Sequence, residues 1–106
     1  MADLPALPVM LGAISERQFQ AQIVGLAELR GWLVYHTWNS RHSTAGFPDL
    51  VLVREYVIFA EIKTEKGKLT AEQEAWIEAI QKAQNYNLRA YVWKPSDWEQ
   101  IVRVLE

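Results

Sequence analysis

Hydrophobic residues recur along the chain with two different spacings, which together predict an α/β fold. Between residues 16 and 30 the apolar positions follow the 3.6-residue period of a helix. Ser15 and Gln18 have the spacing of a capping box at the start of this helix, and Gly31 favours its end. The stripe that we expect to face the core consists of Phe19, Ile23, Leu26 and Ala27.

Three short apolar segments follow this helix, and each is typical of a β-strand. They span residues 32–36, 49–53 and 57–63, and they are rich in β-branched and aromatic residues. The second and third are joined by a turn at residues 54–56, which predicts a hairpin. Both are apolar on both faces, so we expect helices to cover the two strands from both sides.

The remaining third of the chain predicts two more helices with one strand between them. A helix over residues 70–84 and a last helix near the C-terminus flank a strand at residues 88–93. Their expected capping boxes pair Thr70 with Gln73 and Ser96 with Glu99. The side chains expected to face inward are Trp76, Ile77, Ile80 and Ala83 in the first helix, and Trp98, Ile101, Val102 and Leu105 in the second.

Composition limits the classes of protein that this chain can belong to. Half of its 106 residues are hydrophobic, which indicates a globular domain with a single core. A net charge of −2 argues against binding nucleic acid by bulk charge alone, although a local basic site stays compatible with it. With no cysteine, disulfides and thiolate metal sites are excluded, which fits a cytoplasmic protein.

Residues 1–14 differ from the rest of the chain. They are apolar but contain Asp3, Pro5 and Pro8, and they lack a basic leading segment. We interpret them as a tail or arm, neither signal peptide nor membrane helix, preceding a single domain over residues 15–106. No membrane association is expected.

Three polar side chains interrupt the apolar hairpin. Asp49 begins its first strand, and Glu61 and Lys63 lie near the end of its second. Because side chains alternate along a strand, Glu61 and Lys63 point to one face and Ile62 to the other. If the two strands pair as neighbours, Asp49 approaches Glu61 and Lys63. Such a group on an apolar sheet is costly unless it pairs or holds a metal ion, and its hard oxygen ligands suit Mg²⁺ or Mn²⁺.

This pattern is typical of a metal-dependent phosphodiesterase. Asp49 and Glu61 are expected to hold the ion, with the main-chain carbonyl of Ile62 as a third oxygen ligand. The ion would lower the pKa of a bound water and clamp a phosphate oxygen. Lys63 is expected to orient or deprotonate that water, or to stabilise the charge that builds on the phosphate.

A polar loop over residues 37–46 contains Trp38, Arg41 and His42. Long loops in compact domains are often functional, and these side chains can contact phosphates and bases. The alternative is an ordinary solvated loop with Trp38 tucked against the protein. Both interpretations stay open from the residues alone.

A second charged loop, over residues 64–69, follows Lys63 directly. Its lysines, Lys66 and Lys68, are expected to position a phosphate beside the metal ion; the alternative is a solvated turn. Glu16, in the first turn of the first helix, suits the positive end of the helix dipole. It is either a surface acid or a third acid facing the site, and the residues alone favour the surface acid.

Pro48-Asp49 followed by Glu61-Ile62-Lys63 resembles the motif of the PD-(D/E)xK nucleases. A wider set resembles one family of that superfamily, the VRR-NUC or virus-type replication-repair nucleases. This set consists of Ser15-Glu16, Gly46-Phe47-Pro48-Asp49-Leu50, Glu61-Ile62-Lys63 and Leu69-Thr70-Ala71-Glu72-Gln73. The resemblance spans about residues 15–105 in matching order. Pro48-Asp49 followed by Glu61-Ile62-Lys63 often arises by chance when it occurs alone. The combination of these residues with the other motifs at these spacings is specific.

The resemblance implies a restriction-endonuclease-like α/β fold, with a small mixed β-sheet flanked by helices in the order α-β-β-β-α-β-α. It implies that Asp49, Glu61 and Lys63 are catalytic, with Mg²⁺ or Mn²⁺ as cofactor and Glu16 and Gln73 near the metal. Stand-alone members of the family are similar to Holliday-junction resolvases and often form homodimers. The function it implies is therefore a metal-dependent, structure-selective endonuclease that acts on branched DNA and requires no nucleotide cofactor.

One departure from the family pattern and two rival functions bear on this expectation. The segment Ser43-Thr44-Ala45 is neutral where the family often has basic residues, so DNA affinity and substrate preference stay open. The first rival is a catalytically inactive module that keeps the fold to bind nucleic acid or protein. The second is an enzyme acting on RNA, because the metal chemistry acts on the phosphate and ignores the sugar.

Overall fold

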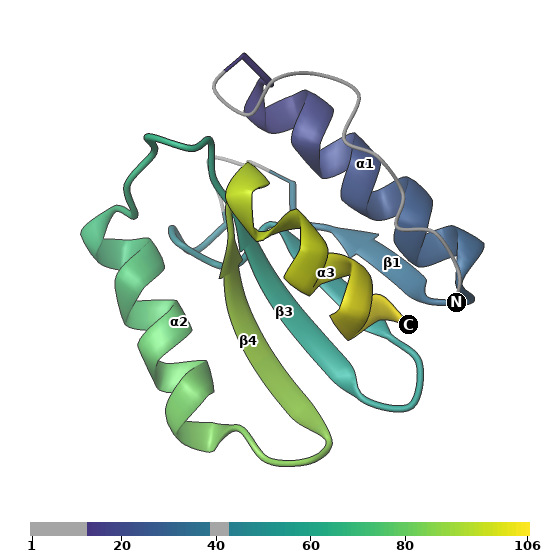
Figure 1. The fold of residues 1–106 in the computed structure, drawn as a ribbon. Coiled ribbons are helices and arrows are strands. Elements are labelled where there is room, and N and C mark those ends of the chain that lie inside the picture. Colours follow the sequence, from purple (N-terminus) through teal and green to yellow (C-terminus); the bar gives the residue numbers. More distant parts are fainter. Residues whose placement is uncertain (1–12, 39–42) are drawn as a thin grey trace.

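The computed structural model describes residues 13–38 and 43–106. These residues form three α-helices, one short 3-10 helix and four strands (Figure 1). In chain order the elements are α1 (Glu16–Leu29), β1 (Leu33–His36), β2 (Leu50–Val53), β3 (Val57–Ile62), α2 (Ala71–Ala83), β4 (Leu88–Trp93), η1 (Pro95–Asp97) and α3 (Trp98–Leu105). The predicted order is confirmed. None of the helices in the described ranges is both long and apolar enough to cross a bilayer.

The four strands form one mixed sheet in the order β1-β2-β3-β4. β1 pairs with β2 and β2 with β3 in antiparallel fashion, whereas β3 and β4 are parallel. The β2–β3 pair is the predicted hairpin, and its register sets Leu50 opposite Ala60. Asp49 therefore enters the sheet beside Glu61. The fold is that expected of a restriction-endonuclease-like domain.

One face of the sheet forms the core together with α1 and α3. The register places Val34, Leu52 and Ile58 side by side on this face. The predicted stripe of α1 is confirmed, because its buried residues are Phe19, Ile23, Leu26 and Ala27. The predicted stripe of α3 is confirmed as well, with Trp98, Ile101, Val102 and Leu105 buried. Ile14, just before the first helix, is also buried in this core.

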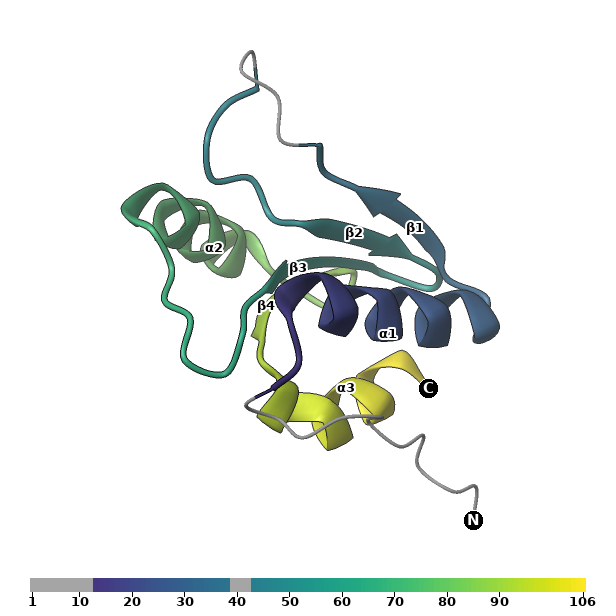
Figure 2. The ribbon, with the colours of Figure 1, turned by 90° about the horizontal axis from the view of Figure 1, so that it is seen from above.

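The opposite face is covered only in part. Helix α2 packs against β4, away from α1 and α3 (Figure 2). Helix α2 lies along one edge of the sheet, so Ile77 is its one fully buried residue. Ala83 is exposed, so the prediction that it faces inward is wrong. Over β1 and β2, Leu33 is 74% and Val53 is 38% exposed. The expectation that β2 is covered on both sides is therefore wrong.

Two of the three predicted capping boxes are present, at Ser15 and at Thr70. The third, Ser96 with Glu99, is wrong. Pro95 starts the 3-10 helix, so α3 begins only at Trp98 and its N-cap residue Asp97 makes no side-chain cap. The Asp97 carboxylate instead accepts a hydrogen bond from the main-chain N–H of Lys94 at 2.9 Å.

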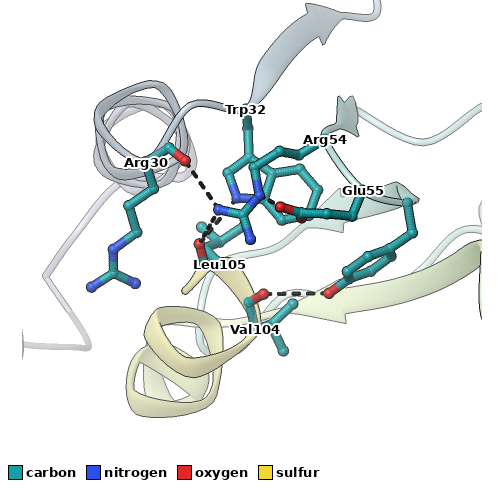
Figure 3. A network of polar contacts seen from close by, with 7 residues as sticks. Arg30, Trp32, Arg54, Glu55, Val104 and Leu105 are labelled. Carbon is teal, nitrogen blue, oxygen red and sulfur yellow. Dashed lines mark hydrogen bonds and ion pairs between the residues drawn. The ribbon is translucent and has the colours of Figure 1, made fainter.

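The last turn of α3 is anchored by polar contacts to the turn between β2 and β3 (Figure 3). Arg54, in the β2–β3 turn, donates hydrogen bonds to the carbonyls of Arg30 at 3.0 Å and Leu105 at 3.3 Å. Its guanidinium lies 4.6 Å from the ring centroid of Trp32, whose indole N–H donates to Leu105 at 3.0 Å. These donors satisfy main-chain carbonyls that a helix end leaves free, and they fix the hairpin against α1 and α3.

Candidate active site

Asp49 and Glu61 meet where the β2–β3 hairpin opens. The main-chain N–H of Ile62 donates a hydrogen bond of 2.8 Å to Oδ2 of Asp49. This bond holds the Asp49 carboxylate against β3, beside Glu61 and Lys63, the residues before and after Ile62. Glu61 is only 1% exposed. Among the residues that the structure describes, it is the one ionisable side chain that is fully buried. The sequence-based expectation that Asp49 approaches the end of β3 is confirmed.

The pKa of Glu61 is raised from its usual 4.5 to about 9. Burial is the largest cause, followed by the hydrogen-bonding contact with the Asp49 carboxyl group and by its negative charge; Lys63 acts in the opposite direction. As two carboxylates the pair would repel each other, and Oε1 of Glu61 has no hydrogen-bond donor among the described residues. Neutralising one of the two charges, by a proton or by a bound cation, removes this repulsion.

The residues present fit a hard divalent cation. Two adjacent carboxyl groups and a buried, unpaired oxygen form a site that a positive charge would stabilise. Within residues 13–38 and 43–106, no cluster of three or more His, Cys, Asp or Glu side chains is arranged to enclose an ion. The other ligands would have to be main-chain oxygens, such as the Ile62 carbonyl, water or a substrate phosphate. Mg²⁺ is commonly bound in this way, by few protein ligands and several waters.

Glu16 lies within electrostatic reach of the site, at the start of α1. Partial burial raises its pKa, the charge of Asp49 raises it further, and Lys63 lowers it. Its side chain is exposed at the rim. The structure thus places Glu16 beside Asp49 and Lys63 without making it part of a ligand cluster.

Gln73 links the start of α2 to the buried acid. Its Oε1 accepts a hydrogen bond from the main-chain N–H of Thr70 at 2.9 Å, which is half of the capping box. Its Nε2 donates to Oε2 of Glu61 at 3.3 Å. The cap therefore orients the amide whose other end holds the Glu61 carboxyl group. The sequence predicted Gln73 as the capping-box partner of Thr70, and the family resemblance implied that it lies near the metal. The structure contains both the capping bond to Thr70 and a hydrogen bond to Glu61.

The loop that carries Asp49 is seated on α2 at Gly46. Gly46 has φ +95°, and a Cβ built there would lie 2.5 Å from the carbonyl carbon of Glu72 and 2.8 Å from the main-chain nitrogen of Gln73. Real Cβ atoms do not approach backbone this closely, so this position requires glycine. The close approach brings the loop directly onto the first turn of α2.

Aromatic rings also hold this loop, against both α2 and β3. Phe47 makes edge-on contacts with Trp76 of α2, at 5.1 Å between ring centroids, and with Phe59 of β3, at 6.0 Å. The indole N–H of Trp76 donates to the carbonyl of Ala45 at 3.2 Å. The half-buried Trp76 therefore packs against the loop that carries Asp49, and contacts from α2 position both Asp49 and Glu61.

Lys63 stands at the edge of a hollow of about 420 Å³ between the loop after β3 and the end of β4. Its charged lining consists of Lys63, Lys68, Lys94 and Glu74, with Leu69 and Val92 as apolar walls. A Cβ at Gly67 would lie 3.0 Å from Oγ1 and 3.3 Å from the main-chain nitrogen of Thr64, so this glycine leaves room for Thr64 in the turn after β3. The hollow therefore adjoins the site at Lys63, and its lining carries three lysines against one acid.

Comparison with protein families places this site in a known group. The family model of the VRR-NUC domain matches residues 8–96. The chain belongs to the VRR-NUC family. Membership implies a nuclease of the PD-(D/E)xK type, a superfamily that generally uses divalent metal ions. Comparison with curated proteins gives no significant match.

The other residues that the sequence predicted for this site lie in different places, and some of them are not near Lys63. Lys68 lines the hollow beside Lys63, whereas Lys66 is exposed and does not line it. Trp38 is 80% exposed, so the interpretation of a tucked tryptophan is wrong. Arg41 and His42 lie outside the described residues.

One residue beside Lys63 was missed from the sequence. Lys94 follows β4 at the level where Lys63 follows β3, because the parallel register pairs Ile62 with Trp93. Only the strand register could have revealed it. Gln20 and His36, to which the sequence assigned no chemistry, are hydrogen-bonded at 3.1 Å between α1 and β1.

Proposed function

We propose that this protein is a metal-dependent DNA endonuclease that hydrolyses phosphodiester bonds in branched DNA such as Holliday junctions, with Mg²⁺ or Mn²⁺ as cofactor. The observation that supports it is the convergence of Asp49, Glu61 and Lys63 at one end of the sheet, with a buried carboxyl oxygen of Glu61 left unpaired. Family membership supports the nuclease class. The branched substrate and the metal are our proposals.

Each residue of this group has a separate task. A bound Mg²⁺ or Mn²⁺ supplies a Lewis acid for a phosphate oxygen and a water of lowered pKa. Asp49, fixed by the Ile62 N–H, and Glu61, fixed by the Gln73 amide, present their carboxyl oxygens in a preorganised arrangement. Lys63 holds the phosphate and stabilises the negative charge that grows on it during attack by water.

A cleavage panel tests this function. Junction, flap, single-stranded and duplex DNA, together with an RNA oligonucleotide, are incubated with Mg²⁺ or Mn²⁺ and with EDTA. We expect junction DNA to be cleaved only with metal, and Lys63→Ala to lose about a hundredfold or more in rate. Lys82→Ala, in the last turn of α2, removes the same charge and should retain the activity. Equal cleavage by Lys63→Ala and the native protein would eliminate the proposed site.

We further propose that two copies pair to act on the two opposed strands of a junction. The support is the uncovered sheet face, where Leu33 is 74% and Tyr35 is 59% exposed on the edge strand β1. These side chains lie on the same face, since they are two residues apart. Sedimentation should give a dimer at micromolar concentration and a monomer for Tyr35→Asp. A native protein that sediments as a monomer would contradict pairing.

A further inference from the structure

We propose that the hollow beside Lys63 binds a second DNA phosphate, adjacent to the scissile one on the same strand, and that Lys68 and Lys94 bind it. This inference rests on the proposed nuclease function, and it extends that site beyond the family motif. It makes Lys94, which no motif marks, a residue that positions the substrate.

The sheet register brings the lysines together. β3 and β4 run parallel with Ile62 opposite Trp93, and the N–H of Lys63 donates to the Trp93 carbonyl at 3.0 Å. Lys63 and Lys94 therefore leave neighbouring strands at the same end of the sheet. Lys68 reaches the same hollow from the loop after β3. With about 420 Å³, the hollow is within the size range of ligand pockets and can hold a phosphate with its sugar.

The charge of the lining favours an anion. Three lysines and one acid, Glu74, line the hollow of a protein whose net charge is −2. The ion pairs found within residues 13–38 and 43–106 join arginine to glutamate, so none of the three lysines is neutralised in this way. A further acid, Glu65, is within electrostatic reach of Lys94 and stays ionised, because the N–H of Ser96, donated to its carboxylate at 2.9 Å, lowers its pKa. With Glu65 and Glu74 against three lysines, the charge around the hollow is still positive.

The walls of the hollow are held in place by hydrogen bonds that main-chain N–H groups donate to carboxylates and to a carbonyl. Asp97 accepts the N–H of Lys94 at 2.9 Å, and the Glu65–Ser96 bond ties the loop after β3 to the end of β4. The turn in that loop is closed by the N–H of Gly67, which donates to Thr64 at 3.0 Å. Lys94 and the loop carrying Lys68 are therefore fixed relative to Lys63.

The same lining favours the sugar–phosphate backbone over a base. Its apolar side chains are Leu69 and Val92, and the described lining contains no aromatic ring on which a base could stack. Phosphate contacts fix the register of a protein on DNA without reading sequence. The hollow thus fits an enzyme that recognises the shape of its substrate.

A salt titration of DNA binding tests the contribution of each lysine. Fluorescence anisotropy in EDTA, where cleavage cannot occur, compares Lys68→Ala and Lys94→Ala with Lys82→Ala, which removes the same charge outside the hollow. Lys68→Ala and Lys94→Ala should each lower the slope of log affinity against log salt concentration by about 0.9. Between 50 and 200 mM salt, the affinity of the native protein should therefore fall about threefold to fourfold more than the affinity of either variant. Slopes for Lys94→Ala and Lys82→Ala that change equally would overturn the inference.

Neutral methylphosphonate linkages locate the contact on the DNA. A single such linkage next to the scissile phosphate should weaken binding by the native protein and have no further effect on the Lys68→Ala/Lys94→Ala double variant. An equal loss in both proteins, or no sensitive position beside the cleavage point, would refute the assignment. Because binding is measured without metal, failure here is distinct from failure of the nuclease proposal, which is decided by cleavage and by Lys63→Ala.

Discussion

Replacing Gly46 by alanine should damage both the fold and the site, because this residue seats the Asp49 loop on α2. Its φ of +95° is a conformation that costs an L-residue about 1–2 kcal/mol. The added Cβ would also lie 2.5 Å from the carbonyl carbon and oxygen of Glu72, and overpacking of this kind costs about 1–3 kcal/mol. The expected loss in the free energy of unfolding is therefore about 2–5 kcal/mol.

Two other glycines separate these contributions. Gly31 also has positive φ, +86°, but nothing lies within 4 Å of a Cβ built there, so Gly31→Ala should lose only the conformational part, about 1–2 kcal/mol. Gly25 lies within α1 with open space around it, so Gly25→Ala should gain about 0.5–1 kcal/mol. The difference between Gly46→Ala and Gly31→Ala then measures the steric contact with α2.

Urea unfolding followed by circular dichroism gives the three free energies. Cleavage by the folded fraction of Gly46→Ala should fall as well, because the clash displaces Asp49 from Glu61, whereas the other two variants should cleave normally. A loss of stability for Gly46→Ala no larger than that for Gly31→Ala would refute the close approach of the loop to α2.

Two further predictions concern the buried acid and its support. The pKa of Glu61 in the folded protein, about 9, lies above its usual 4.5, so between these pH values the folded state binds more protons and its stability falls as pH rises. In EDTA, Glu61→Gln should therefore gain stability relative to the native protein between pH 5 and pH 9, by at most about 1.4 kcal/mol per pH unit; thermal melts with a pH-independent difference would contradict this. Thr70→Ala removes the hydroxyl that accepts the main-chain N–H of Gln73 and should cost about 1 kcal/mol in urea unfolding. The main-chain N–H of Thr70 still holds Oε1 of Gln73, so metal affinity should change little in Thr70→Ala, whereas Gln73→Ala should bind metal more weakly. Equal metal affinity of Gln73→Ala and the native protein would show that this amide does not orient Glu61.

The features that local sequence patterns predicted well depend on few neighbouring residues. The stripe of α1 and the caps at Ser15 and Thr70 need only helical spacing. The meeting of Asp49 with Glu61 needs only a hairpin with a short turn, since such a hairpin fixes its own register.

The features that were missed depend on contacts between distant segments. Lys94 joins the site through a parallel register set by the whole β3–α2–β4 crossover. The cap predicted at Ser96 is absent because a 3-10 helix starts at Pro95 and includes Ser96. The N–H of Ser96 also donates to Glu65, in the loop after β3. Ala83 matched the helical period but is exposed at the last residue of α2, because burial depends on what the helix packs against and not on spacing alone.

Calorimetric titration with Mn²⁺ in the absence of DNA tests most directly whether Asp49 and Glu61 hold a divalent ion together. The matched variant is Asp49→Asn, whose side-chain oxygen can still accept the Ile62 N–H, so the fold should persist in urea unfolding. We predict that the native protein binds Mn²⁺ and that Asp49→Asn binds it at least about tenfold more weakly. Equal affinity in the two proteins, or no binding by the native protein, would contradict the account.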